Sequence, residues 1–368
     1  GVSAISTRFF LTNGSGTTSA ISNIAGHQPP KKHKSVNNDV LVIGAPDVEA
    51  ALQGREAQVL DAVRKAYETH TRGATSLPHS SFLRFPDSDK DRIICLPAYL
   101  GEDYQLAGVK WIASVPANVE KGMERASAVM ILNDRATGRP VAVLEGSIIS
   151  KQRTAASAAL ASQALAAGEP DVIGLVGCGP INLAVVQFLV AVWPATQKFM
   201  LYDLSSARAD SFAGSLKTLK PDATIKVASS LDQLLAECPM VSLGTTAIKP
   251  HVAGLDDCPV DSTLLHVSLR DLSAAAILGH HNFVDDLDHV NRASTSIHLA
   301  SQQEGHTRFV HSTLGELLLG VKPLPERDGR PFIFSPFGLG ILDLAVADLV
   351  MKIVAEERGG TLVKSFLP

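Results

Sequence analysis

The sequence has 368 residues, and its 33 lysines and arginines against 37 aspartates and glutamates give a formal net charge of −4. Apolar residues make up 45% of the chain and charged residues only 19%, which indicates a folded protein and excludes an extensively disordered one. A general binder of polyanions needs a strong basic excess. We therefore expect neither nucleic acid nor a membrane surface as a partner.

Four widely spaced cysteines without a C-x-x-C pair are typical of a reducing compartment, so we predict a cytoplasmic protein. No stretch reaches the roughly 18 consecutive apolar residues of a membrane span. Residues 1–38 are rich in Ser, Thr, Asn and Gly and lack the pattern of a secretory signal. We predict that they form a flexible tail.

From residue 39 the patterns become regular. The expected elements are a strand at 40–43, a helix at 48–70, strands at 92–96, 108–113, 128–133 and 140–145, and an alanine-rich helix at 150–167. Asn133-Asp134 and Thr137-Gly138 are turn residues, so the last two strands are predicted to form a hairpin. This part reads as an α+β unit with an antiparallel sheet.

Beyond residue 171, short apolar strands alternate with helices, which predicts a parallel, doubly wound α/β sheet. The expected strands lie at 172–176, 199–202, 224–228, 241–244, 264–269 and 283–286. A final helix is predicted to begin at Ser335-Pro336 and to end before Gly359-Gly360.

A dinucleotide-binding pattern follows the strand at 172–176. Gly177 permits a tight turn and Gly179 lets the backbone approach a pyrophosphate, with Pro180 and Ile181 opening the helix. The third position of the fingerprint holds Asn182 in place of Gly or Ala. The alternative is a turn whose glycines serve packing only.

Asp203 ends the next strand, where a carboxylate accepts hydrogen bonds from ribose hydroxyls and repels a 2′-phosphate. The sequence therefore predicts NAD as the cofactor in preference to NADP. Arg208 lies near enough to weaken this preference and is a further candidate cofactor contact.

Two cations upstream are candidates for binding a carboxylate. Lys110 lies in an apolar strand, where an unpartnered cation is costly, and Arg153 opens the alanine-rich helix. Arginine can hold a carboxylate through two parallel hydrogen bonds. The alternative is ordinary ion pairing with one of the nearby acids, Glu120, Glu124 or Glu145.

The order of these pieces resembles the ornithine cyclodeaminase/mu-crystallin family. The shared features are the strand lysine, N-x-x-x-G, the Thr-Gly hairpin, R-T-A-A on a helix, G-x-G and the terminal "SPFGLGILDLAVADL". The resemblance covers about residues 40 to 360. It implies an NAD-binding Rossmann domain at 171–325, inserted in an α+β substrate-binding and dimerisation domain of residues 39–170 plus 326–368, and a homodimer.

The same resemblance implies residue roles. Lys110 and Arg153 match substrate-binding positions, with Arg153 also beside the cofactor, and Phe337 lies in the terminal motif. Asp271 matches the catalytic aspartate. The implied cofactor contacts are Thr154, Thr245 and Ser268.

Three departures from the cyclodeaminase pattern point to another substrate. Asp271 lies in "HVSLRDLS" in place of Gly-Asp-Cys-Pro-Gly-Lys, which argues against ring-forming deamination. An early substrate arginine is missing near Ser80, and we predict that Arg84, on the same strand face, replaces it. Arg125 stands where cyclodeaminases carry Thr. The alternative interpretation of Arg125 is a solvated arginine on a loop.

The strings "ERAS" and "GCGPIN" resemble one branch of the family, the dehydrogenases of N-(2-amino-2-carboxyethyl)-L-glutamate. This implies an NAD-dependent oxidative hydrolysis of an amino-acid substrate to L-2,3-diaminopropionate and 2-oxoglutarate, with Asp271 and Lys110 as catalytic residues. The alternatives are an ornithine or lysine cyclodeaminase, a ketimine or opine-type reductase, and a mu-crystallin-like binding protein without turnover. The acids and histidines at 280–289 match no standard metal pattern, so no metal is predicted.

Overall fold

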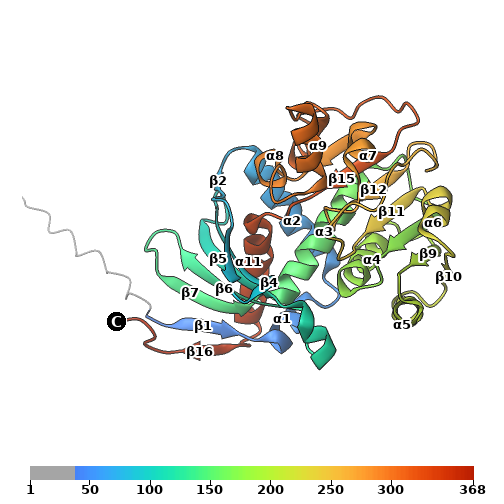
Figure 1. Ribbon diagram of the computed structural model, residues 1–368. Helices are drawn as coiled ribbons and strands as arrows, with labels where there is room; N and C mark the ends of the chain where they lie inside the picture. The colour runs from blue at the N-terminus through green and yellow to red at the C-terminus, as the bar shows by residue number, and fades with distance from the viewer. Residues whose placement is uncertain (1–37) are drawn as a thin grey trace, which may run out of the picture. The chain divides into compact units, whose positions relative to one another are not determined.

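The computed structural model describes residues 38–368, so the predicted tail lies outside the described residues except for Asn38. Two eight-stranded sheets flank a pair of helices, α3 (Ser147–Leu165) and α11 (Gly340–Glu356) (Figure 1). Helix α11 packs on the first sheet, and α3 contacts both α11 and the second sheet. No helix within residues 38–368 is long and apolar enough to cross a membrane.

The first sheet is antiparallel except at one pair of strands. Its strands are β1 (Val40–Ile43), β2 (Thr75–Ser76), β3 (Ser81–Phe85), β4 (Ser88–Leu100), β5 (Leu106–Ser114), β6 (Ala126–Asp134), β7 (Pro140–Glu145) and β16 (Thr361–Val363). Their order is β16-β1-β7-β6-β5-β4-β2, with β3 paired to β4. β6 and β7 pair in antiparallel fashion, which confirms the predicted hairpin, whereas β1 and β7 are parallel.

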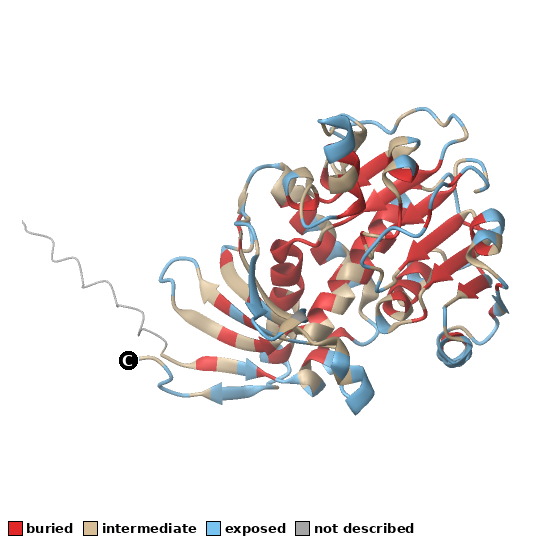
Figure 2. Cartoon of the chain, in the orientation of Figure 1, coloured by how far each residue is buried: buried red, intermediate tan, exposed pale blue. Residues whose placement is uncertain are grey.

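The two faces of this sheet differ because side chains alternate along each strand. Lys110, Met130 and Leu144 stand side by side on the face that α11 covers, and all three are buried. Trp111, 41% exposed, and Val129, 36% exposed, pair on the opposite face. Figure 2 shows these strands largely in the colours of intermediate and exposed residues.

The second sheet is entirely parallel. Its strands are β8 (Val172–Val176), β9 (Lys198–Tyr202), β10 (Thr224–Val227), β11 (Met240–Leu243), β12 (Thr263–Leu265), β13 (His281–Val284), β14 (Val310–Thr313) and β15 (Phe332–Ser335). The order β10-β9-β8-β11-β12-β15-β13-β14 starts with the 3-2-1-4-5 arrangement of a Rossmann sheet. The predicted fold class, a Rossmann α/β unit combined with an α+β unit, is confirmed.

Helices cover this sheet and connect its strands. They are α4 (Pro180–Val192), α5 (Ser206–Leu219), α6 (Leu231–Glu237), α7 (Ala274–Leu278), α8 (Leu287–Val290), α9 (Ser296–Glu304) and α10 (Leu314–Leu318). The inner strands are buried almost throughout (Figure 2), as expected of a parallel sheet with both faces covered, whereas the edge strands β10 and β14 are more exposed.

Two expectations about helices were wrong. The helix predicted at 48–70 is two helices, α1 (Ala45–Leu52) and α2 (Glu56–Thr71), because Gly54 takes the left-handed conformation with φ +68° between them. The final helix begins at Gly340, because Ser335 ends the buried strand β15. β15 lies inside the parallel sheet, and the chain then enters α11; the predicted domain boundaries stay a prediction.

Candidate active site

The loop between β8 and α4 leaves room for a ligand at the helix N-terminus. Gly177 has φ +87°, and a Cβ there would lie 2.7 Å from the carbonyl oxygen of Gly244, so only glycine suits this turn. A Cβ on Gly179 would meet no atom within 4 Å, and Pro180 occupies the first turn of α4, next to Ile181. Free backbone N–H groups at such a terminus attract phosphate.

The side chain of Asn182 holds this loop in place through buried hydrogen bonds. Its side chain is fully buried, and Nδ2 donates to the carbonyls of Val176 at 2.9 Å and Gly177 at 2.8 Å. Its Oδ1 accepts from the Ser242 hydroxyl at 2.7 Å. The departure at the third fingerprint position therefore has a structural reason, because the amide links β8 to β11 where a glycine would leave the space empty.

Asp203 lies at the carboxyl end of β9, beside the loop. Its Oδ2 accepts from the backbone N–H of Cys178 at 2.8 Å and its Oδ1 from that of Ser205 at 2.9 Å. Burial and the charge of Asp203 raise the pKa of the Cys178 thiol to about 12, so the thiol stays protonated at neutral pH. Arg208 is exposed in the first turn of α5.

These features fit a dinucleotide. The open glycine and the N-terminus of α4 suit its pyrophosphate, and the fixed carboxylate of Asp203 suits a ribose diol. Thr154, in the second turn of α3, donates its hydroxyl to the Ser150 carbonyl and stays partly exposed.

A buried ion triad lies where α3 and α11 meet β5. The Lys110 ammonium donates to Oδ2 of Asp343 at 2.7 Å and to the Ser150 hydroxyl at 2.9 Å, and Nε of Arg153 donates to Oδ1 of Asp343 at 3.0 Å. The side chains of Asp343, Lys110 and Arg153 are 0%, 2% and 11% exposed. Burial lowers the pKa of Lys110 to about 8, against the attraction of Asp343.

Asp343 is the member of the triad that the sequence analysis missed. Burial would raise the pKa of its carboxyl, but Arg153 and Lys110 outweigh burial and keep that pKa below its ordinary value. The available signal was an acid on the apolar side of the terminal helix. The alternative of pairing with Glu145 was wrong, because that carboxylate accepts from the backbone of Ser147 and Ile148 at the start of α3.

A tight turn holds Phe337 next to the triad. Gly338 has φ +94°, and a Cβ there would lie 2.7 Å from Nη1 of Arg153, so a larger residue would displace the guanidinium. Asp285, fully buried, accepts from the backbone N–H of Phe337 at 2.9 Å and of Gly338 at 2.6 Å. Asp285, directly after β13, therefore positions this turn.

Hydroxyls and imidazoles surround the buried carboxylate of Asp271, and the backbone N–H of Asp271 donates to Nε2 of His266 at 3.1 Å. Its carboxylate accepts from the hydroxyls of Thr245 and Ser268, lies 3.0 Å from Nε2 of His251 and lies 3.3 Å from Nε2 of His266. Burial would raise the pKa of Asp271, but His266, Ser268 and Thr245 outweigh it and hold the pKa well below its ordinary value. The three residues predicted here are thus brought together, and both histidines were missed.

His266 connects this group to the triad. Its Nδ1 lies 3.0 Å from the hydroxyl of Ser335, which ends β15 just before Phe337 and Gly338. The segment 335–338 therefore runs from the neighbourhood of Asp271 to that of Arg153.

Four arginines form a further cluster, which we call the arginine cluster: Arg84, Arg92, Arg125 and Arg270. Arg84 and Arg92 are direct cross-strand partners of β3 and β4, and Arg92 shares its sheet face with Lys110. Val115 directly follows β5, the strand that pairs with β4. Its backbone N–H donates to the carbonyl of Arg125 at 2.9 Å.

Like charges directly opposite one another destabilise a sheet. Burial lowers the pKa of Arg92, and the charges of Arg125, Arg270 and Arg84 lower it further. None of the four forms an ion pair with a described side chain; Arg270 donates to the Ala293 carbonyl at 2.8 Å, and Arg84 lies over the Phe82 ring. Arg92 and Arg270 were missed, although Arg270 directly precedes Asp271.

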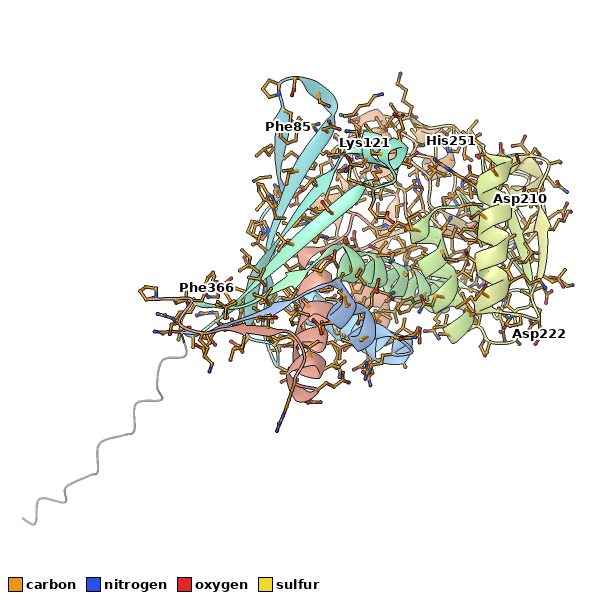
Figure 3. The ribbon with its side chains drawn as sticks, turned by 90° about the horizontal axis from the view of Figure 1, so that it is seen from below. Phe85, Lys121, Asp210, Asp222, His251 and Phe366 are labelled. Carbon is orange, nitrogen blue, oxygen red and sulfur yellow. The ribbon has the colours of Figure 1, made fainter. Side chains whose placement is uncertain are left out.

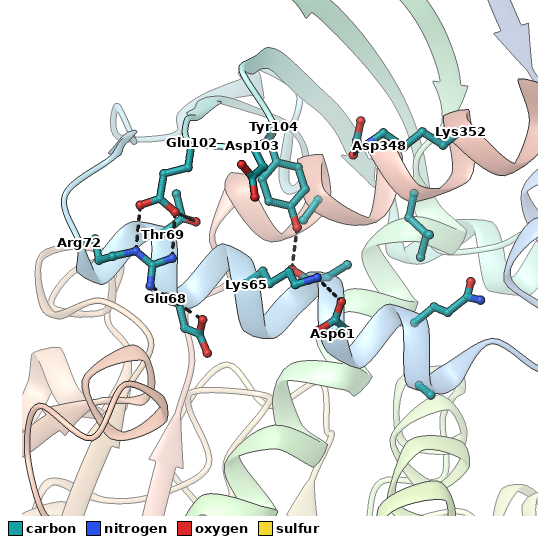
Figure 4. Close-up of a pocket in the computed structure, with 15 residues that line it drawn as sticks. Asp61, Lys65, Glu68, Thr69, Arg72, Glu102, Asp103, Tyr104, Asp348 and Lys352 are labelled. Carbon is teal, nitrogen blue, oxygen red and sulfur yellow. Dashed lines mark hydrogen bonds and ion pairs between the residues drawn. The ribbon is translucent and has the colours of Figure 1, made fainter.

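The ends of several of these segments lie along the same edge of the molecule in Figure 3. Figure 3 labels Phe85 at the end of β3, Lys121 in the short helix η1 (Pro116–Lys121) and His251 along one edge of the view. A separate pocket of about 630 Å³ lies between α2, α11 and the turn after β4 (Figure 4). Its lysines and its arginine are paired within the pocket, as in Lys65–Asp61, so it lacks a free cation for an anionic ligand.

Comparison with known proteins agrees with this architecture. The sequence model of the ornithine cyclodeaminase/mu-crystallin family matches residues 40–358. The chain is 27% identical to the N-((2S)-2-amino-2-carboxyethyl)-L-glutamate dehydrogenase of Staphylococcus aureus, over 90% of this chain and all of that protein.

Two solved structures are similar throughout. The Δ1-pyrroline-2-carboxylate reductase of Thermococcus litoralis, in complex with NADH and L-proline, has a TM-score of 0.81 at 25% identity and covers 88% of this chain and 100% of its own. An archaeal alanine dehydrogenase dimer with bound NAD has a TM-score of 0.78 at 26% identity, covering 89% and 99%. The chain belongs to the ornithine cyclodeaminase/mu-crystallin family.

Proposed function

We propose that this chain is an NAD-dependent oxidoreductase that converts N-(2-amino-2-carboxyethyl)-L-glutamate to L-2,3-diaminopropionate and 2-oxoglutarate. Its relatives are dehydrogenases and reductases of amino-acid-derived substrates, and the similarity to the staphylococcal enzyme extends over that whole protein. The choice of this particular substrate, in contrast, depends on the residues of this chain.

The arginine cluster is the observation that carries this substrate. None of the four guanidiniums forms an ion pair with a described side chain, and the charges of Arg125, Arg270 and Arg84 repel that of Arg92, so an anion bound among them would be favourable. The triad already places Asp343 between Lys110 and Arg153, so those two cations retain one net positive charge, enough for one carboxylate. An amine that carries three carboxylates matches both sites, whereas ornithine or alanine carries only one.

The two sites are suitably spaced. Arg92 and Leu96 stand on one face of β4, and Leu96 pairs with Lys110, so about four strand residues, or roughly 13 Å of strand, separate the arginine cluster from the triad. Because arginine and lysine side chains are long, the charged groups of Arg92 and Lys110 can lie closer together than their backbone positions. A conjugate of two amino acids would thus lie along β4 and β5.

NAD would be held by the glycine loop, the N-terminus of α4 and Asp203, with Thr154 nearby on α3. Bound NAD supplies an acceptor for the hydride from the glutamate α-carbon. Lys110 and Arg153 would orient the neighbouring carboxylate, with Phe337 beside them, and thereby aim the C–H bond. Asp271 belongs to the proton-transfer machinery beside this carbon.

We also propose a homodimer formed through the open face of the first sheet. Trp111, Val129 and Ile131, respectively 41%, 36% and 37% exposed, form an apolar strip on that face. Single exposed apolar residues are ordinary, but contiguous ones are typical of an interface. The related archaeal alanine dehydrogenase is a dimer.

The test is incubation of the protein with NAD and the tricarboxylate amine. We expect equal amounts of NADH, 2-oxoglutarate and diaminopropionate, measured by absorbance and mass spectrometry. Release of ammonia and a cyclic imino acid from ornithine, without net NADH, would contradict the proposal. Binding of NADH without turnover of any amine would instead indicate a binding protein.

The Arg92→Gln variant tests the cluster itself. Loss of one charged hydrogen-bonding group, worth about 1.5–3 kcal/mol, should raise KM for the tricarboxylate by roughly 10- to 150-fold while KM for NAD stays unchanged. Arg135→Gln, which removes an arginine stacked on Tyr99 outside the cluster, is the matched control. Equal effects of both changes would remove Arg92 from the site.

A further inference from the structure

Asp271 and His251 differ in how far their side chains are exposed to solvent, and this difference bears on proton transfer. Asp271 is 0% exposed, and hydroxyls and imidazoles surround its two oxygens. The side chain of His251 is 38% exposed, and only its Nε2 faces the carboxylate, at 3.0 Å. Its Nδ1 forms no hydrogen bond with a described residue.

The backbone fixes this pair. Both His251 and Val252 donate their N–H groups to the Asp271 carbonyl at 2.9 Å, and Val252 forms a β-bridge with Leu272. The loop that carries His251 is therefore attached directly to the loop that carries the aspartate. His266, the other imidazole at Asp271, is fully buried and bonded to Ser335, so it cannot reach a substrate.

We propose that His251 is the catalytic residue that exchanges protons with the substrate, and that Asp271 is a positioning residue that acts through it. Asp271 accepts from Nε2–H of His251, which leaves the lone pair of Nδ1 available on a side chain that is 38% exposed. A carboxylate that orients an imidazole in this way fixes its tautomer and stabilises the protonated ring. The inference rests on the proposed function, whose imine must be hydrolysed.

Two proton transfers through His251 follow. A water oxygen bonds to the carbon of the protonated imine, the C=N π pair moves to nitrogen, and the proton that the water loses passes to Nδ1 of His251. His251 then returns a proton to that nitrogen, and the C–N bond breaks with its electron pair on nitrogen. The C=O bond forms as the hydroxyl proton passes through solvent to the released amine, so one water is consumed and no further oxidant is needed.

The charged and titratable groups near His251 come from its own loop and from the loop of Asp271. Asp271 faces it directly, with His266 behind the carboxylate and Arg270 in the same loop. Lys249, two residues earlier, is exposed. An imidazole is the ordinary side chain that changes charge near neutral pH, which suits a group that must both accept and donate.

The first test needs no substrate. Long-range ¹H–¹⁵N NMR of the full chain should show His251 in the Nε2–H tautomer, identified by its loss in His251→Gln, and Asp271→Asn should convert it to a mixture. His281, which lies 3.0 Å from Asp328 at the opposite edge of the second sheet, is the matched control and should not change. If His251 keeps the same tautomer in Asp271→Asn, then Asp271 does not orient His251, and the proposed pair is contradicted.

The second test separates hydride transfer from hydrolysis in a single turnover with NAD. In His251→Gln we expect NADH to form but 2-oxoglutarate to appear at least 100-fold more slowly than in the wild type. Imidazole in solution should restore part of the release in His251→Ala, and NADH affinity, measured by protein fluorescence, should stay unchanged. His281→Gln should match the wild type.

Release of 2-oxoglutarate by His251→Gln within threefold of the wild-type rate would overturn the catalytic assignment. A wild-type protein that makes no 2-oxoglutarate at all would overturn the proposed function and the hydrolysis step with it. The tautomer experiment would then still decide whether Asp271 orients His251, so the two failures are distinguishable.

Discussion

Replacement of Asp343 by Asn tests the buried triad. The change keeps the shape of the side chain and removes the anion that Lys110 and Arg153 share at 2.7 and 3.0 Å. At an effective dielectric constant of about 20, each contact represents roughly 6 kcal/mol of gross attraction, most of which desolvation offsets. Removing one member of such a group leaves a buried charge unpaired, so we expect a loss of about 3–5 kcal/mol in the free energy of unfolding.

The loss should depend on pH with a definite sign. Lys110 has a folded pKa of about 8, below its ordinary 10.5, so wild-type stability rises as the pH rises from about 8 towards 10.5. Without Asp343 that pKa falls further, and the lysine is neutral in the folded variant near pH 7. Each pH unit below 8 then adds up to about 1.4 kcal/mol to the difference between the proteins. We expect the destabilisation at pH 6 to exceed that at pH 9 by about 3 kcal/mol.

Urea unfolding followed by circular dichroism at pH 6 and pH 9 measures both quantities. Asp61→Asn is the control, because Asp61 pairs with Lys65 on α2 and both side chains are more than half exposed. Exposed pairs contribute about 1 kcal/mol or less. A loss below 1 kcal/mol, or the same loss at both pH values, would refute the reasoning that Lys110 is charged and dependent on Asp343.

Three further outcomes are expected. Asn182→Ala should weaken NADH binding and reduce stability by about 1–3 kcal/mol in urea unfolding, because two buried carbonyls lose their donor. Asp203→Ser should lower the preference for NAD over NADP at least tenfold in steady-state kinetics, while Asp210→Ser, exposed on α5 (Figure 3), should not. Ile131→Glu should give a monomer by light scattering; Val227→Glu, on a strand of the other sheet and 47% exposed, should not. A dimeric Ile131→Glu protein would exclude the proposed interface.

Local patterns predicted much of the fold. Continuous apolar runs gave β8 its bounds, and turn residues identified the β6–β7 hairpin. The errors came where a conformation depends on a distant partner. Ser335-Pro336 has the residues of a helix start, but the preceding residues 332–335 are needed between β12 and β13, so the strand continues to Ser335.

The candidate site also contains residues that a local motif identified and residues that only the three-dimensional fold brings together. Residues defined by a local motif, such as Gly177 and Asp203, lie where the sequence indicated. Asp343 is 233 residues from Lys110, and His251 meets Asp271 only because two loops of the parallel sheet join through a backbone bridge. A one-dimensional pattern carries no sign of such pairings, although an acid inside an apolar helix was a reason to look for a buried cation.

The contrast between the triad and the arginine cluster explains how one site can select by charge. In the triad, a carboxylate of the chain itself balances one of the two buried positive charges, so the site folds before any ligand arrives. In the arginine cluster the repulsion between Arg84 and Arg92 remains in the free protein, and a ligand that neutralises it stabilises the folded state. Such a ligand raises the free energy of unfolding by about 2.7 kcal/mol at a concentration 100 times its Kd. A tricarboxylate should therefore raise the melting temperature in the absence of NAD, and acetate should not, because only the former reaches both the triad and the cluster.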